Sequence, residues 1–191
     1  MDLVHAIQIA DEIIGLYEKH GGNEYAGEAV TQLQHMYQSA ELAREQNREA
    51  DIILAAFLHD IGHICVHAEE ENQMNGYGTK NHEGVGAEFL AKHAFSTRVI
   101  TLVEAHVEAK RYLTWKHPEY YDQLSEASKI TLSYQGGVMN SEEAAEFEQD
   151  PLFKEKVIMR HLDDEAKDPS KPVGDLSFYR RLIIQHLQQQ N

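Results

Sequence analysis

The chain has 191 residues, a length that suits one domain with a sizeable buried core. Its 32 acidic residues outnumber the 17 basic ones, and the net charge of −15 argues against nucleic-acid partners and anionic membranes. The sequence also contains 12 histidines, and histidine is the commonest metal ligand in proteins. Acidity combined with abundant histidine therefore directs attention to metal chemistry.

A single cysteine, Cys65, excludes an intramolecular disulfide and a zinc site built on two cysteines, and it fits a reducing cytosol. Its neighbours Ile64 and Val66 favour a small packed side chain, while nearby histidines leave a nucleophilic thiol as the alternative. The N-terminus has neither a basic stretch nor a long apolar segment, so we expect no signal peptide. The longest apolar run, residues 52–58, is too short to span a bilayer, and we expect a cytoplasmic protein.

Apolar residues recur at three- and four-residue steps along the chain, which is the period of an α-helix. Leu3 to Tyr17 predict a first helix that Gly21-Gly22 closes, and Val30 to Ala43 predict a second. Residues 49–61 predict a third helix that is apolar on most faces and therefore central in the core. Residues 63–80 predict a long polar loop, and a loop of that length is more often functional than idle.

The second half of the chain predicts helices that begin at capping residues. Asn81 predicts a helix that runs to about Ala91, and Ser96 predicts one that runs to about Tyr112. Further helices are expected from His117-Pro118, over 126–134, from Asp150-Pro151 to about Lys167, and over Asp175 to Gln189. No segment is typical of a strand, a repeat or a low-complexity linker. The sequence predicts one all-α domain over residues 1–191, a helical bundle of about eight or nine helices.

Histidine and aspartate side chains recur on different predicted helices. In chain order they are His35, the pair His59-Asp60, His82, His106 and the pair Asp163-Asp164. Helical bundles build metal sites by projecting side chains inward from facing helices. The pair on the apolar helix is the strongest sign, because a buried ionised Asp60 needs a cation beside it. We interpret this series as candidate metal ligands, and histidines outside it, except His63, as packed or surface side chains.

The series resembles the HD-domain superfamily of all-α metalloproteins, over roughly residues 25–185. The resemblance implies two metal ions with six shared ligands: His35, His59, Asp60 and Asp163 for one ion, and Asp60, His82 and His106 for the other. In the family pattern the last ligand falls on Asp163, with Asp164 as the competing choice. Four histidines and two carboxylates suit iron, manganese or zinc, and ligand type alone does not choose among these metals.

Most HD proteins are phosphohydrolases, and a minority are mixed-valence di-iron oxygenases. Lys110 lies one turn after His106, and Arg160 lies one turn before Asp163, so both suit an anionic substrate group beside the metal ions. His63 follows the His-Asp pair and is a candidate donor to the same anion. Each feature also has a plain alternative, such as a solvated lysine or a histidine at the end of a helix. Together they favour the oxygenase branch.

The segment from Gly22 to Met36 closely resembles the oxygenases that convert 2-amino-1-hydroxyethylphosphonate to glycine and phosphate. In that family a Tyr-x-x-Glu lid covers the metal pair, and Tyr25 and Glu28 match it. The resemblance implies that Glu28 meets the substrate ammonium or an iron, whereas a loop with a capping glutamate is the alternative. It further implies Ser128 as a hydroxyl donor to the phosphonate, and two iron ions, Fe(II) and Fe(III), as the cofactor.

We therefore expect a di-iron dioxygenase that uses O2 to cleave the carbon–phosphorus bond of 2-amino-1-hydroxyethylphosphonate or a close N-substituted analogue. Its partners are expected to be this small molecule and O2, with no nucleic acid, membrane or obligate protein partner. A metal-dependent phosphohydrolase of nucleotides or small phosphoesters is the alternative, and a non-catalytic HD module is a third hypothesis. The sequence leaves open the metal, N-methylation of the substrate and the oligomeric state.

Overall fold

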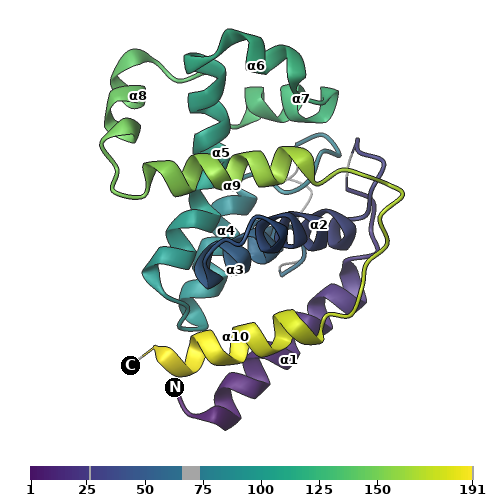
Figure 1. Cartoon of the computed structure of the whole chain (residues 1–191). Helices are drawn as coiled ribbons and strands as arrows, with labels where there is room; N and C mark the ends of the chain where they lie inside the picture. The colour runs from purple at the N-terminus through teal and green to yellow at the C-terminus, as the bar shows by residue number, and fades with distance from the viewer. Residues whose placement is uncertain (26, 66–73, 191) are drawn as a thin grey trace.

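The computed structural model describes residues 1–25, 27–65 and 74–190, and these ranges contain ten α-helices, one short 3-10 helix and no strand (Figure 1). The elements are α1 (Leu3–His20), α2 (Gln32–Glu45), α3 (Ala50–Leu58), η1 (Ile61–His63), α4 (His82–Lys92), α5 (Thr97–Lys116), α6 (Pro118–Gln123), α7 (Glu126–Tyr134), α8 (Ser141–Glu148), α9 (Phe153–Glu165) and α10 (Ser177–Gln189). The predicted all-α fold is confirmed, with slightly more helices than expected.

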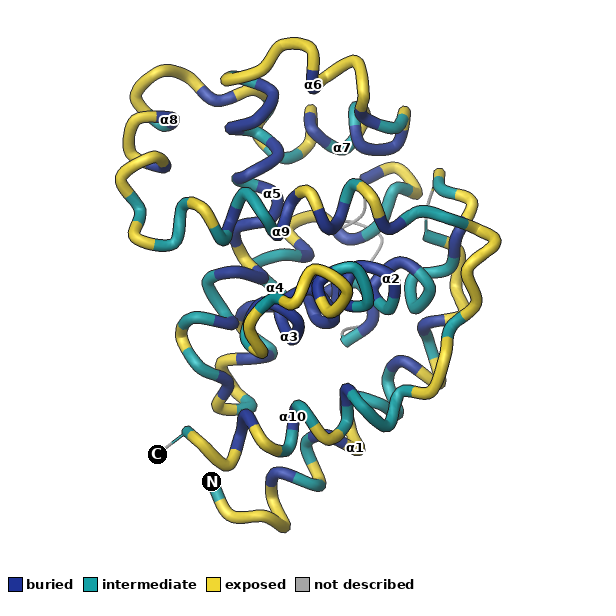
Figure 2. Tube along the Cα trace, in the orientation of Figure 1, coloured by how far each residue is buried: buried dark blue, intermediate teal, exposed yellow. Residues whose placement is uncertain are grey.

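Helix α3 forms the centre of the molecule. Residues 52–58 are all buried, and the helix packs against α2, α5, α9 and α10 (Figure 2). A helix that is apolar on every side finds its lowest free energy where other helices cover all of its faces. Because His59 and Asp60 follow α3 directly, the chain delivers both side chains to the middle of the core.

The two ends of the molecule have different roles. At one end α1 and α10 pack side by side, and the N-terminal ammonium donates to the carbonyl oxygen of Gln190 at 2.8 Å (Figure 1). At the other end α6, α7 and α8 gather around the second half of α5, over a smaller apolar cluster that includes Tyr112 and Phe147. Helices from the centre and from this second end together line the cavity described below.

Several element boundaries differ from the sequence predictions. Helix α3 ends at Leu58, so His59 is its C-cap and Asp60 lies in the turn that follows, not inside the helix. Asn81 precedes α4 in a left-handed conformation, with φ of 57°, and its side chain makes no capping bond. Helix α9 begins at Phe153, because the Asp150 carboxylate accepts from the backbone N–H of Leu152 at 2.7 Å and holds a turn there.

Helix α8 was not predicted, although Asn140 and Glu143 form a capping box at its start. Within the described ranges no helix is long and apolar enough to cross a membrane. Cys65 is half-buried against the core, and burial raises the pKa of its thiol to about 11. This placement favours the packed role for Cys65 over a nucleophilic one. Residues 66–73 of the predicted loop lie outside the described residues.

Candidate metal centre

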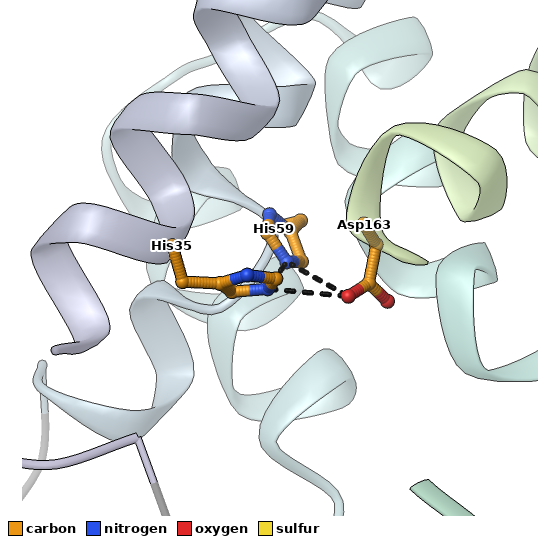
Figure 3. A group of neighbouring side chains, drawn as sticks. All are labelled: His35, His59 and Asp163. Atoms are coloured by element: carbon orange, nitrogen blue, oxygen red, sulfur yellow. Dashed lines mark hydrogen bonds and ion pairs between the residues drawn. The ribbon is translucent and has the colours of Figure 1, made fainter. Parts of the chain in front are cut away.

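Three side chains from separate elements converge in the core (Figure 3). His35 comes from α2, His59 from the end of α3 and Asp163 from α9, and all three are buried. The Nε2 atoms of the two histidines lie 3.0 Å apart, and Asp163 Oδ1 lies 3.1 Å from His35 Nε2 and 3.9 Å from His59 Nε2. The structure places Asp163, and not Asp164, against the histidines.

The hydrogen bonds on the far sides of the two rings show what kind of group fits between them. Nδ1 of His35 lies 2.9 Å from the carbonyl oxygen of Ala166, and Nδ1 of His59 lies 2.9 Å from that of Ala56. Since a carbonyl only accepts, each Nδ1 carries a proton, and a ring in its neutral form has its lone pair on Nε2. Two lone pairs and the Asp163 carboxylate therefore face one another, and a metal cation satisfies all three.

Asp60 connects this group to a second pair of histidines. Its Oδ2 lies 3.4 Å from His59 Nε2 and 3.6 Å from His35 Nε2. Its Oδ1 lies 3.1 Å from His82 Nε2 and 3.4 Å from His106 Nε2. Both oxygens are buried and make no hydrogen bond. A buried carboxylate without donors, with one oxygen toward each histidine pair, has the arrangement of a ligand that bridges two cations.

The second histidine pair also brings two Nε2 atoms together, although only His106 has a carbonyl partner. The Nε2 atoms of His82 and His106 lie 2.9 Å apart, and Nδ1 of His106 lies 2.7 Å from the carbonyl oxygen of Val103. Nδ1 of His82 faces the Glu83 carboxylate at 3.4 Å. Helix α4 reaches this position because residue 62 is glycine: a Cβ on Gly62 would lie 1.9 Å from the His82 carbonyl oxygen.

His63 lies beside the second pair, stacked on the His82 ring with centroids 4.1 Å apart. Its Nδ1 accepts the backbone N–H of Thr79 at 3.1 Å, so the proton of the neutral ring sits on Nε2. Burial, reinforced by His82, lowers the pKa of His63 to about 3, and the ring is neutral at physiological pH. Gly78, with φ of +93°, brings the loop close enough to hold the ring, since a Cβ there would lie 2.6 Å from it.

A small cavity adjoins the cluster. The space open to the centres of water-sized groups is about 50 Å³, which suits a small molecule. Its lining comes from α5, α7 and α9, from η1, and from the segments around the starts of α2 and α4. The lining residues used below are Tyr25, Gln32, His63, Tyr77, Lys110, Ser128, Thr131, Gln135, Arg160 and Asp163.

Lys110 is the principal cation of the cavity. It is buried, and its Nζ donates to Thr131 Oγ1 at 3.0 Å. Burial, together with the positive charge of Arg160, lowers the pKa of the Lys110 ammonium to about 7. A buried ammonium that faces a cavity and has no water around it is stabilised strongly by an anionic ligand. Lys110 therefore suits an anionic group near His106, the role that its spacing predicts.

Arg160 also lines the cavity, but most of its donors face protein groups. Its Nε donates to the Tyr120 hydroxyl at 2.8 Å, Nη1 donates to Asp163 Oδ2 at 2.7 Å, and Nη2 donates to Asp164. Of the five N–H groups of a guanidinium, two remain for a ligand. The structure thus gives Arg160 a role that the sequence did not reveal, which is to hold Asp163 toward the histidines, and its expected contact with a phosphonate stays a prediction.

The predicted lid residues occupy different environments. Tyr25 stacks on the His35 ring, with centroids 4.3 Å apart, and burial beside Asp60 raises the pKa of its phenol well above the usual value. Glu28 does not meet the cavity: its carboxylate accepts from Lys167 Nζ at 2.7 Å and from Ser125 Oγ at 2.5 Å. In this structure Lys167 therefore supplies the counter-charge of Glu28, and the expected contact of Glu28 with an ammonium or an iron stays a prediction.

Ser128 lines the cavity as expected, and its Oγ accepts from Lys167 at 3.3 Å. Sequence reasoning missed Thr131 on the same helix, α7, and Gln135 at its C-cap, although steps of three and four residues from Ser128 place all three on one side. It also missed Gln32 and Tyr77, for which the sequence offers no comparable signal.

Similarity to known proteins agrees with this geometry. A family model described as the HD domain matches residues 33–166, which is most of the chain. The chain belongs to the HD-domain family. The clustered histidines and aspartates, from His35 to Asp163, lie within this match.

Three relatives of this HD-domain protein cover most of its length. An uncharacterized protein, L432, of Acanthamoeba polyphaga mimivirus is 46% identical over 95% of this chain and 83% of its own. The [1-hydroxy-2-(trimethylamino)ethyl]phosphonate dioxygenase (glycine-betaine-forming) of Leisingera caerulea is 37% identical over 94% and 92%. The hydroxymethylphosphonate dioxygenase of Gimesia maris is 40% identical over 86% and 81%. The chain is thus similar to two HD-domain oxygenases of phosphonates.

Proposed function

We propose that this HD-domain protein is a dioxygenase that cleaves the carbon–phosphorus bond of a 1-hydroxyphosphonate, and that its substrate is 2-amino-1-hydroxyethylphosphonate. The names of two relatives describe dioxygenases of phosphonates with a hydroxyl group on the carbon next to phosphorus. The observation that carries the proposal in this chain is the buried Lys110, which faces a small cavity next to the histidine cluster. That position suits a compact anion such as a phosphonate.

We infer that the cluster holds two metal ions with the six ligands that the sequence predicts: His35, His59, Asp60, His82, His106 and Asp163. Facing Nε2 lone pairs and the unpaired oxygens of Asp60 support this inference. Imidazole and carboxylate ligands suit iron, and the two dioxygenase relatives favour iron over manganese or zinc. When bound, an iron pair supplies the redox capacity that a reaction with O2 requires.

The protein side chains have separate tasks in this proposal. Lys110 binds a phosphonate oxygen, with the hydroxyl groups of Ser128 and Thr131 as further donors. His63 holds its proton on Nε2 and donates toward the same anion. Arg160 fixes the orientation of Asp163. It also adds positive charge to the anion-binding wall, which Lys110, Ser128 and Thr131 form. The fixed donors replace water around the charged substrate, so little reorganisation is needed when the bonds change.

The overall reaction balances with one molecule of O2 and no external reductant. The C1–H and C–P bonds of the substrate break, and glycine and inorganic phosphate form. The carboxylate of glycine gains one oxygen atom at C1, and phosphate gains one oxygen atom at phosphorus. The substrate is oxidised at carbon while O2 is fully reduced, so both atoms of O2 end in the two products.

The alternative of a nucleotide phosphohydrolase has less support. A cavity of about 50 Å³ favours a compact substrate over a nucleoside. Among the described residues of the lining, no aromatic pair is free to sandwich a base, because Tyr25 already stacks on His35. Small phosphoesters fit by size, and the test below separates them from phosphonates.

Phosphate release from 2-amino-1-hydroxyethylphosphonate tests the proposal when it is measured with iron-loaded enzyme, first without oxygen and then after O2 is admitted. We expect release only after O2 is admitted, with one phosphate formed per O2 consumed. His59→Ala should abolish release, because it removes a metal-facing side chain, while His161→Ala, an exposed histidine on α9, should retain it. Equal release without oxygen would contradict the proposal and favour hydrolysis.

A further inference from the structure

An unpaired acceptor lies in the wall of the cavity. Gln32 is the first residue of α2, and its side-chain Oε1 is buried without a hydrogen-bond partner. Gln32 precedes His35 by three residues, so both side chains lie on one face of the helix. A buried acceptor without a donor costs free energy in the empty protein, and a ligand that brings a donor recovers it.

The anion-binding groups determine which end of a substrate can reach Gln32. Lys110, Ser128 and Thr131 belong to α5 and α7, whereas Gln32, Tyr25 and Tyr77 come from other segments of the chain. If the phosphonate binds to the side chains of α5 and α7, the substituent on C2 points to the remaining wall, which carries Gln32, Tyr25 and Tyr77. Gln32 is then the acceptor that meets the substituent on C2.

The chemistry of this remaining wall restricts the substituent. Among the described lining residues the one carboxylate is Asp163, which Arg160 and His35 already engage. An aromatic cage for a quaternary ammonium is not assembled either. Tyr25 has one face against His35, and the Tyr77 ring lies 3.1 Å from the position of a Cβ on Gly27. A neutral amide oxygen suits a group that donates an N–H.

We propose that Gln32 determines specificity for the substituent on C2 by accepting a hydrogen bond from a primary ammonium through Oε1. This inference rests on the proposed function and adds the selection of an amino over a trimethylamino substrate. A trimethylammonium group has no N–H, so it would bury Oε1 without a partner. A site built to accept a hydrogen bond discriminates strongly against an analogue that cannot donate one.

Three substrates separate the contribution of Gln32 from that of the anion-binding wall. The kcat/KM for phosphate release is measured with 2-amino-1-hydroxyethylphosphonate, its N-trimethyl analogue and hydroxymethylphosphonate, which has no C2 group. The native enzyme should prefer the amino substrate to the trimethyl analogue by roughly 10-fold or more. Gln32→Leu should lower kcat/KM for the amino substrate by roughly 10- to 100-fold, and for hydroxymethylphosphonate much less.

Two further variants act as controls. Gln135 lies one turn beyond Thr131 on the anion-binding wall, and its Oε1 is also buried without a partner. Because Gln135 adjoins Thr131 and not the substituent on C2, Gln135→Leu should leave the preference for the amino substrate over the trimethyl analogue unchanged. Gln32→Glu keeps an acceptor at residue 32 and should preserve the preference for the amino substrate. Substrate affinity without O2 and iron content are measured for each variant, as readouts that do not depend on turnover.

The outcomes distinguish the two proposals. If the native enzyme cleaves none of the three phosphonates with O2, the proposed function fails. If it cleaves them but Gln32→Leu lowers all three alike, or Gln32→Glu loses the amino preference, the role of Gln32 in specificity fails. If Gln32→Leu loses iron, Gln32→Glu decides the question alone.

Discussion

Single residues of the centre are oriented by groups outside it. Carbonyl oxygens of Ala166, Ala56 and Val103 each hold an imidazole proton on Nδ1 and so aim the Nε2 lone pairs inward. Such outer partners fix the tautomer and raise the basicity of a metal ligand. Arg160 does the same for Asp163 through a 2.7 Å hydrogen bond to Oδ2, which leaves Oδ1 toward His35.

The neighbouring aspartates of α9 should therefore differ sharply in their effect on metal binding. Asp163→Asn removes a charged oxygen from the cluster and should lower iron content, measured as iron per chain after purification. Asp164→Asn loses only an outer contact to Arg160 and Tyr120 and should retain iron, with affinity reduced by about 10-fold at most. Equal loss of iron in both variants would contradict the assignment of Asp163 as the ligand.

Lys110 predicts a pH dependence of substrate binding. Its pKa of about 7, lowered from 10.5, means that the free enzyme carries the ammonium below pH 7 and loses it above. Because a phosphonate anion is attracted only to the protonated form, the contribution of Lys110 to affinity should be complete at pH 6 and decline through pH 7 to 8. Binding isotherms without O2, measured across this range, test the direction.

Two variants isolate this titration from that of the phosphonate itself. Lys110→Arg keeps a permanent charge and should remove the decline in affinity above pH 7. Lys110→Ala should weaken binding at low pH by about 10-fold or more, while iron content stays normal. A loss of iron in Lys110→Ala would instead indicate a structural role for the lysine.

The candidate ligands were predictable from sequence because their positions follow from helix order and spacing, as for His35 and His106. The partners of Glu28 and Arg160 were not. Glu28 is bound by Lys167, which is 139 residues away in the chain, and no local pattern announces such a contact. Helix spacing correctly placed Arg160 on the same face as Asp163. Its structural role is revealed by the hydrogen bond that it donates to Tyr120, which lies 40 residues earlier in the chain.

Helix α4 reaches the centre only because η1 contains glycine at residue 62. Gly62→Ala would push a Cβ into the His82 carbonyl, and we expect a loss of about 1–3 kcal/mol in the free energy of unfolding, with weaker metal binding. Gly15→Ala is the matched control on α1, where nothing lies within 4 Å of an added Cβ. It should stabilise the protein by about 0.5–1 kcal/mol. Urea unfolding measures both, and equal effects would contradict this account.

The segment that carries Tyr25 and Glu28 is tied to the end of α9 by the ion pair between Glu28 and Lys167, both largely buried. Lys167→Gln should loosen this segment, and amide hydrogen exchange over residues 22–30 should become faster. Lys171→Gln, an exposed lysine of the same loop, should leave the exchange rates unchanged. If both variants exchange alike, the ion pair does not hold the segment.

At the level of elements, periodicity predicted most helices well, and local capping decided the errors. The apolar pattern extends to residue 61, yet α3 ends at Leu58 because His59 and Asp60 turn toward the cluster. Helix α8 was missed because half of its residues are glutamates and few are apolar.

For the whole molecule, periodicity predicted an all-α protein and the histidine-aspartate series predicted a metal centre, but neither could give the size of the cavity. A net charge of −15 means that an anionic substrate meets a repulsive surface. The cavity reverses this locally, since Lys110 and Arg160 line it together. Size and charge together select a small anion, which is the property that connects the fold to the proposed reaction.

Isotope labelling tests the central claim most directly. The enzyme is loaded with iron and given 2-amino-1-hydroxyethylphosphonate under 18O2 in ordinary water, and the products are analysed by mass spectrometry. Dioxygenase chemistry predicts one labelled oxygen atom in phosphate and one in the carboxylate of glycine. Phosphate without label, or phosphate that takes its new oxygen from labelled water, would contradict the account.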